Sequence, residues 1–177
     1  MRVLSMTHVR EIALLLGLGL LLPVESKAAE LRRGRCHMDH CQWFSIESRK
    51  VVGTSHRGSL IKVEHRWWES LHPNGTYSKR TRGTGGALNS AYILCSTASP
   101  AFVNPEPNGQ WKPMYLPTQR IAGATETGLI YYFAVCHGID LNGRRDWPNA
   151  IARLGYRADP DEALKTDFRA PEDILAF

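Results

Sequence analysis

The alternation of apolar and polar residues is clearest after Gly58, where it has the two-residue period of a β-strand. The alternating positions are Ile61, Val63, His65 and Trp67 on one face and Lys62, Glu64, Arg66 and Trp68 on the other. Pro73-Asn74-Gly75 follows and predicts a hairpin turn, because Asn and Gly tolerate positive φ. We therefore expect a return strand over 76–80 and a mobile glycine-rich loop over 83–86.

Further runs rich in β-forming residues predict more strands. They cover residues 43–54, 87–103 and 111–116, with a turn over 104–109. The run from Leu129 to Cys136 differs because it is apolar at every position. Such a run is typical of a central strand that is buried on both faces, so we predict a strand here as well.

The last forty residues carry helix signals instead. Asp146 with Pro148, and Asp159 with Pro160, are typical of a helix N-cap and first turn, and Gly155 suits a helix end. A third short helical segment is expected from Pro171 onwards. The sequence thus predicts an α+β fold, with a mostly antiparallel β-sheet of about six or seven strands and two or three short C-terminal helices.

The N-terminus has the layout of a secretory signal. Arg2 and Arg10 precede an apolar stretch over 12–24, and Ser26-Lys27-Ala28 places small residues at positions −3 and −1 of a cleavage site. We predict a signal peptide over 1–28, cut after Ala28, and a periplasmic or secreted protein with no integral membrane segment after its removal. The remaining 29–177 would form one β-rich domain, with a β core over 29–139 and a helical tail over 140–177.

Composition agrees with a single domain, since the chain has 177 residues and 43% of them are hydrophobic. All four cysteines follow the predicted signal, and an even number in an oxidising compartment predicts two disulfides. Of the three connectivities, we favour Cys36–Cys41 with Cys95–Cys136. The first pair would close a small loop, and the second lies in two runs that could be sheet neighbours.

The segment between Cys36 and Cys41 also holds His37, Asp39 and His40, all of which are residue types that bind metals. Ligands this close in sequence cannot all face one ion, and cysteines in an exported protein tend to be oxidised. We therefore favour a disulfide loop, keep His37 and His40 as minor metal candidates, and expect no cofactor.

Positive charge is concentrated in the first part of the exported chain. Residues 32–82 hold eleven lysines and arginines against four acids, although the whole chain has a net charge of only +5. Aromatic residues stand beside several of these bases, which would suit a polyanion such as a polysaccharide or lipid phosphate. The candidates for polyanion binding are Arg66, Lys79, Arg80 and Arg82. A solvated strand face is the alternative that we favour, and export argues against nucleic acid as a partner.

No catalytic motif is present in the sequence, and we assign no catalytic residue. The alternative is a small secreted hydrolase or metal-dependent enzyme that uses histidines such as His65 or His137. The favoured function is an exported accessory or binding protein without catalysis, whose partner is an anionic envelope component or another exported protein. Asn74-Gly75-Thr76 would accept an N-glycan in a eukaryote, but the compact signal favours a bacterial source, where this segment is only a turn.

Overall fold

The structure is a computed structural model that describes residues 29–78, 83–118, 123, 125–142, 146–156 and 166–176. The predicted signal peptide over 1–28 and the helix expected after Asp159 lie outside these residues. In the part of the chain that is described, no helix has both the length and the apolar character needed to cross a membrane.

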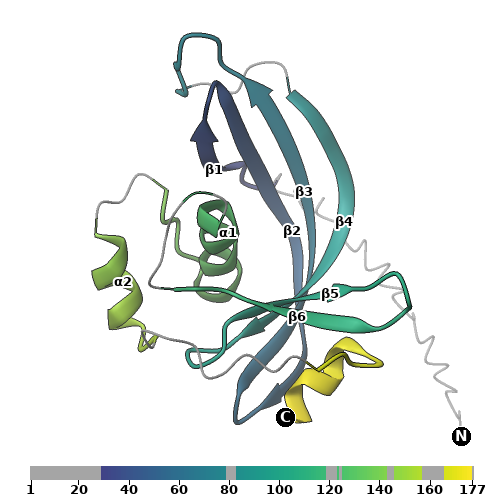
Figure 1. The fold of residues 1–177 in the computed structure, drawn as a ribbon. Coiled ribbons are helices and arrows are strands. Elements are labelled where there is room, and N and C mark those ends of the chain that lie inside the picture. Colours follow the sequence, from purple (N-terminus) through teal and green to yellow (C-terminus); the bar gives the residue numbers. More distant parts are fainter. Residues whose placement is uncertain are drawn as a thin grey trace, which may run out of the picture.

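Six strands form one antiparallel sheet in which each strand pairs with the next along the chain (Figure 1). The strands are β1 (Arg32–His37), β2 (His40–Ser55), β3 (Gly58–Leu71), β4 (Gly83–Cys95), β5 (Ala101–Pro105) and β6 (Trp111–Tyr115). This arrangement confirms the predicted antiparallel α+β fold. The alternating segment after Gly58 lies in β3, and the run predicted over 43–54 lies in β2.

The sheet is strongly curved, and its local irregularities explain the curvature. Register shifts interrupt the β2–β3 ladder between Ile46 and Ser48 and the β3–β4 ladder between Arg66 and Trp68. An extra residue in one strand increases the local twist and bends that strand. The long strands therefore wrap around a concave side, which Figure 1 shows to be occupied by a helix.

That helix corrects the prediction of a central strand from Leu129 to Cys136. The run belongs to α1 (Thr125–His137), in which every residue from Leu129 to Val135 is buried. A continuous apolar run fits either a buried strand or a helix that is buried all round, and its periodicity does not distinguish them. The β core predicted over 29–139 therefore contains the central helix of the domain.

α1 is buried all round because it lies between two layers. Its neighbours in the main hydrophobic cluster include Phe44, Val63 and Ile93 of the sheet. Leu141 and Trp147 belong to the same cluster, the latter from α2 (Trp147–Arg153). Figure 1 shows α2 beyond α1 and away from the sheet, so the order of layers is sheet, α1 and α2.

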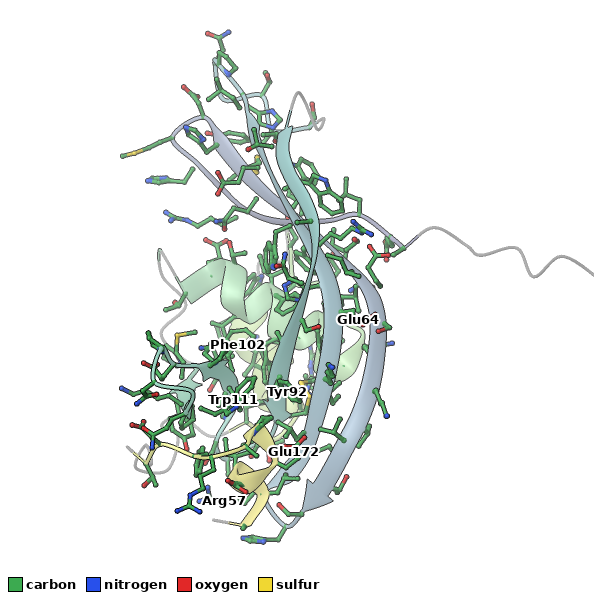
Figure 2. The ribbon with its side chains drawn as sticks, turned by 90° about the vertical axis from the view of Figure 1, so that its right-hand side faces the viewer. Arg57, Glu64, Tyr92, Phe102, Trp111 and Glu172 are labelled. Carbon is green, nitrogen blue, oxygen red and sulfur yellow. A yellow bond between two sulfur atoms is a disulfide. The ribbon has the colours of Figure 1, made fainter. Side chains whose placement is uncertain are left out.

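The C-terminal segment covers the opposite face of the sheet at one end. It contains the short 3-10 helix η1 (Pro171–Ala176), where a helical segment was predicted. Ile174 and Phe168 belong to a second hydrophobic cluster with Leu60, Leu94, Ala101 and Val103 of the sheet, and Tyr92 and Trp111 pack against it. Tyr92 and Trp111 meet edge to face, with ring centroids 5.2 Å apart, and Figure 2 shows them beside η1. At this end of the sheet, neighbouring residues of β3 and β4 are thus buried on opposite faces: Val63 and Ile93 in the main cluster, and Leu60 and Leu94 in the second.

Three smaller predictions about strand ends were wrong. Residues 76–78 lie in a turn and not in a return strand, and the glycine-rich segment 83–86 begins β4 instead of forming a loop. The expected single strand over 87–103 is divided between β4 and β5. The glycines in segment 83–86 are needed within the strand and do not mark a loop. At Gly85, a φ of +114° and the nearby Trp67 carbonyl leave no room for a Cβ.

The structure forms disulfides between Cys36 and Cys41 and between Cys95 and Cys136, the connectivity favoured from the sequence. The first joins β1 to β2 at directly opposite positions. The second fastens β4 to α1, so the reason given for this pair, two neighbouring strands, was wrong. Each disulfide thus links elements that are adjacent in the fold.

Lys62 should tolerate substitution, because it lies on the face of β3 away from α1, with Nζ 5.9 Å from the Tyr92 ring centroid. We expect Lys62→Ala to lower the free energy of unfolding by less than about 0.5 kcal/mol. Ile93→Ala, at a fully buried position on the opposite face, should lower it by about 2–5 kcal/mol. Urea unfolding of both variants checks this, and an unfolded Lys62→Ala variant would show that the two faces are assigned wrongly.

Candidate functional site

The six histidines of the described chain fall into two groups by exposure. His65 and His72 are buried, whereas His37, His40, His56 and His137 are exposed. A catalytic or binding histidine must reach its ligand. Only the exposed group can therefore meet a ligand without a change in the fold.

His72 forms a hydrogen-bonded pair with Ser70 that the sequence analysis missed. Ser70 Oγ lies 2.7 Å from His72 Nε2, and His72 Nδ1 lies 2.8 Å from the carbonyl oxygen of Thr76. Because a carbonyl can only accept, Nδ1 carries the proton, and Nε2 accepts the proton of the serine hydroxyl. This is the arrangement by which a base activates a serine nucleophile.

The surroundings of this Ser70–His72 pair show a structural role in the folded state. The exposed fractions of Ser70 and His72 are 2% and 1%, so a substrate has no access to the hydroxyl. Trp43 Nε1 also donates to Ser70 Oγ, at 2.7 Å. The pair therefore joins β2, the end of β3 and the following turn through internal hydrogen bonds.

His65 is enclosed by aromatic rings between the sheet and α1. Its Nδ1 lies 2.9 Å from the hydroxyl of Tyr131, and the ring of Trp67 also contacts it. Burial lowers the pKa of His65 and raises the pKa of Tyr131, so both groups are neutral near pH 7. The sequence analysis named His65 as a possible base for an enzyme. The structure places it in a closed position between the sheet and α1.

The lowered pKa of His65 predicts that the protein loses stability in mild acid. Below pH 6.5 the unfolded chain binds a proton that burial disfavours in the folded chain, so the contribution of His65 falls as the pH falls. We expect His65 to contribute at most about 1.4 kcal/mol to the loss at pH 5.5. Urea midpoints at pH 7.5 and 5.5 measure it. His56→Gln should keep the pH dependence and His65→Gln should reduce it; a dependence that is identical in both variants would contradict this assignment.

His137 begins a chain of hydrogen bonds that leads into the core. Its Nε2 lies 2.6 Å from the hydroxyl of Tyr156, which donates to the hydroxyl of Tyr132 over 3.1 Å. The backbone N–H of Ser96 in turn donates to Tyr132, at 3.0 Å. Burial raises the pKa of Tyr156 to about 12 and lowers the pKa of His137. The chain ties α1 and the segment after α2 to the end of β4.

A cavity of about 380 Å³ gathers exposed polar side chains between the β1–β2 hairpin and the start of α1. It is lined by Arg35, His37, His40, Gln42, Glu69, Gly123 and Thr127. Arg35 holds the hairpin against the helix, since its backbone N–H donates to Thr127 Oγ1 at 3.0 Å and its Nε lies 3.4 Å from a Glu126 oxygen. We name this space the tip cavity. It contains both minor metal candidates of the sequence analysis.

The turn beside this cavity, Met38-Asp39, is exposed and firmly held. Met38 is 77% exposed and, with Asp39, has positive φ (49° and 62°), as a two-residue hairpin turn requires. This conformation is unfavourable for a methionine. The Cys36–Cys41 disulfide and a hydrogen bond from the His72 N–H to the Asp39 carbonyl hold it in place. We call residues 36–41 the tip; Figure 1 shows this hairpin at the end of the sheet furthest from η1.

A second cavity, of about 370 Å³, lies near the end of α1, and its arginines have partners within the chain. Arg49 Nη1 donates to the carbonyl of Val135 at 3.0 Å, and Arg32 Nη2 lies 3.1 Å from a Glu30 oxygen. A cation at a helix C-terminus stabilises the helix. Arg49 therefore stabilises the end of α1, whereas Arg32 Nη1 is buried without a hydrogen-bond partner among the described residues.

Of the four predicted polyanion-binding residues, the structure describes Arg66. Arg66 donates to the carbonyl of Gly86, and its Nε lies 3.6 Å from a Glu47 oxygen. Lys79, Arg80 and Arg82 lie outside the described residues. Polyanion binding by these four residues stays a prediction.

The described residues thus contain an exposed tip with an adjoining cavity, and hydrogen-bond networks that include His65, His72 and His137. Comparisons of the chain with protein-family models, with curated proteins and with solved structures gave no match.

Proposed function

We propose that this chain is an exported, disulfide-stabilised binding protein without catalytic activity, and that it binds its partner through the tip. The observation that carries the proposal is the exposure of Met38 on a turn that is held by a disulfide. An exposed methionine adapts well to a partner surface. A turn that is already ordered loses little conformational entropy on binding.

The distribution of chemical groups supports binding over catalysis. Ser70 and His72 have the geometry of a nucleophile and base but are buried, whereas the exposed side chains gather around the tip cavity. Met38 also occupies a backbone conformation in which Gly or Asn would be less strained. A strained residue held by its surroundings is more typical of a functional surface than of a neutral one.

The two disulfides support export, because such bonds form and persist in oxidising compartments. Of the two kinds of partner predicted from the sequence, the structure favours another exported protein. A polysaccharide or lipid phosphate would be recognised mainly through charge. The tip instead presents two exposed apolar side chains, Met38 and Leu71, and an apolar surface suits a protein partner. Leu71 is 50% exposed and lies opposite His40.

Site-specific cross-linking tests this proposal. A photo-reactive phenylalanine analogue is introduced at Met38, and in a control variant at Val51, which is 58% exposed near the other end of β2. After irradiation with the exported protein fraction of the source, we expect one defined protein adduct from position 38 and none from position 51. Equal adducts at both positions, or none at either, would contradict the proposal.

A small hydrolase is the second candidate, and the Ser70–His72 pair is the observation that favours it. For hydrolysis, the turn after β3 would have to open and Ser70 would have to lose the hydrogen bond from Trp43. Both changes would expose groups that are now buried and paired, and unpaired buried groups are costly. Binding therefore remains the better supported function.

A further inference from the structure

His37 and His40 lie directly opposite each other where β1 and β2 meet the turn. Opposite residues of an antiparallel pair carry their side chains on the same face, with Cβ atoms about 4.5–5.5 Å apart. Both histidines are exposed, and both line the tip cavity. Two imidazoles placed in this way can reach one ion between them.

The backbone at this pair of histidines is held in place on both sides. The neighbouring positions Cys36 and Cys41 are joined by the disulfide, and the two-residue turn closes the other side. Ordering of a site before binding increases the affinity, because less conformational entropy is lost. Both thiols of this hairpin are used in the disulfide. Apart from the Met38 thioether, the two imidazoles are then its nitrogen or sulfur side-chain ligands for a metal.

Charges around the pair do not oppose a cation. The guanidinium group of Arg35 lies beside the carboxylate of Glu126, with Nε 3.4 Å from its oxygen. Glu69 supplies a carboxylate to the wall of the same cavity. The neighbourhood of the two imidazoles therefore combines a partnered positive charge with a carboxylate in the cavity wall.

We propose that His37 and His40 bind a single divalent transition-metal ion, with Cu²⁺ held most tightly. Imidazole suits copper, nickel and zinc, and affinity among these ions is greatest for Cu²⁺. Among the residues that the structure describes, no group of three or more His, Cys, Asp or Glu side chains is arranged to hold a metal. The ion thus has two protein ligands and open positions for water or a partner's donor. This inference rests on the proposed function, because both place the binding site of the protein at the tip.

Copper titration of the tag-free, oxidised protein tests this site. We expect one Cu²⁺ per chain by calorimetry and hyperfine coupling to two nitrogens by electron paramagnetic resonance. Loss of an outer-shell group commonly lowers metal affinity about 10–100-fold, so His37→Ala or His40→Ala should lower it at least about tenfold. The coupling should then come from one nitrogen. His56→Ala is the matched control, since His56 is an exposed histidine in the β2–β3 turn.

Three results would overturn the site: no stoichiometric binding of Cu²⁺, unchanged affinity in His40→Ala, or an equal loss in His56→Ala. The state of the fold is checked by comparing the urea midpoint of each variant with that of the parent protein. A protein that fails to bind copper but forms an adduct at position 38 would refute the metal site alone. Copper binding without an adduct would support the metal site and contradict the proposed protein partner.

Discussion

Replacing both Cys95 and Cys136 with serine is expected to lower the free energy of unfolding by about 4 kcal/mol. The two cysteines are 41 positions apart, so their disulfide closes a long loop and restricts the unfolded chain strongly. In the folded state it fastens α1 to β4, and both residues pack against the main hydrophobic cluster. Losing it should therefore weaken the attachment of the central helix to the sheet.

The matched control is the double replacement of Cys36 and Cys41, which are only 5 positions apart. The same loop-entropy relation gives about 2 kcal/mol for this pair. Equilibrium urea unfolding of the two double variants and the parent protein measures both values. A loss at Cys36–Cys41 that equals or exceeds the loss at Cys95–Cys136 would contradict this account of the disulfides.

Phe133→Ala is expected to lower the free energy of unfolding by about 3–5 kcal/mol. Phe133 lies in the middle of α1 and is fully buried, and its ring contacts those of Tyr132, His137 and Tyr156. Removing it leaves a cavity that rigid neighbours on the disulfide-fastened helix cannot readily fill. The effect follows from the position of α1 between two layers.

Leu88→Ala controls for a general effect of removing apolar atoms. Leu88 is 51% exposed, and its replacement should change the free energy of unfolding by no more than about 0.5 kcal/mol. Urea midpoints compare the two variants. A change below about 1 kcal/mol in Phe133→Ala would mean that α1 is not buried on its side away from the sheet.

The sheet could be predicted from the sequence because its strands alternate, whereas the central helix could not. Along β3, one residue in two faces α1, and this period is visible in the chain itself. From Leu129 to Val135 every residue is buried, so no polar face marks the turns of a helix. Only the layers on both sides of α1 determine its form, and they come from distant parts of the chain.

The candidate site, like the fold, could be predicted only in part from the sequence. His37 and His40 stand out in sequence because they are close to each other and to two cysteines. Their shared cavity depends on Thr127 in α1, which was expected to precede a strand. The Ser70–His72 pair leaves the local signal Ser-x-His at the end of a strand, but its third member, Trp43, becomes a neighbour only through the β2–β3 register.

The histidines at the tip are exposed, whereas Ser70 and His72 are buried. Modification of histidines in the native, oxidised protein by diethyl pyrocarbonate, followed by mass spectrometry, measures this directly. We predict that His37 and His40 react about as fast as the exposed His56, and that His72 stays unmodified until the protein unfolds. Reaction of His72 at the rate of His56 would contradict the claim and favour a hydrolase.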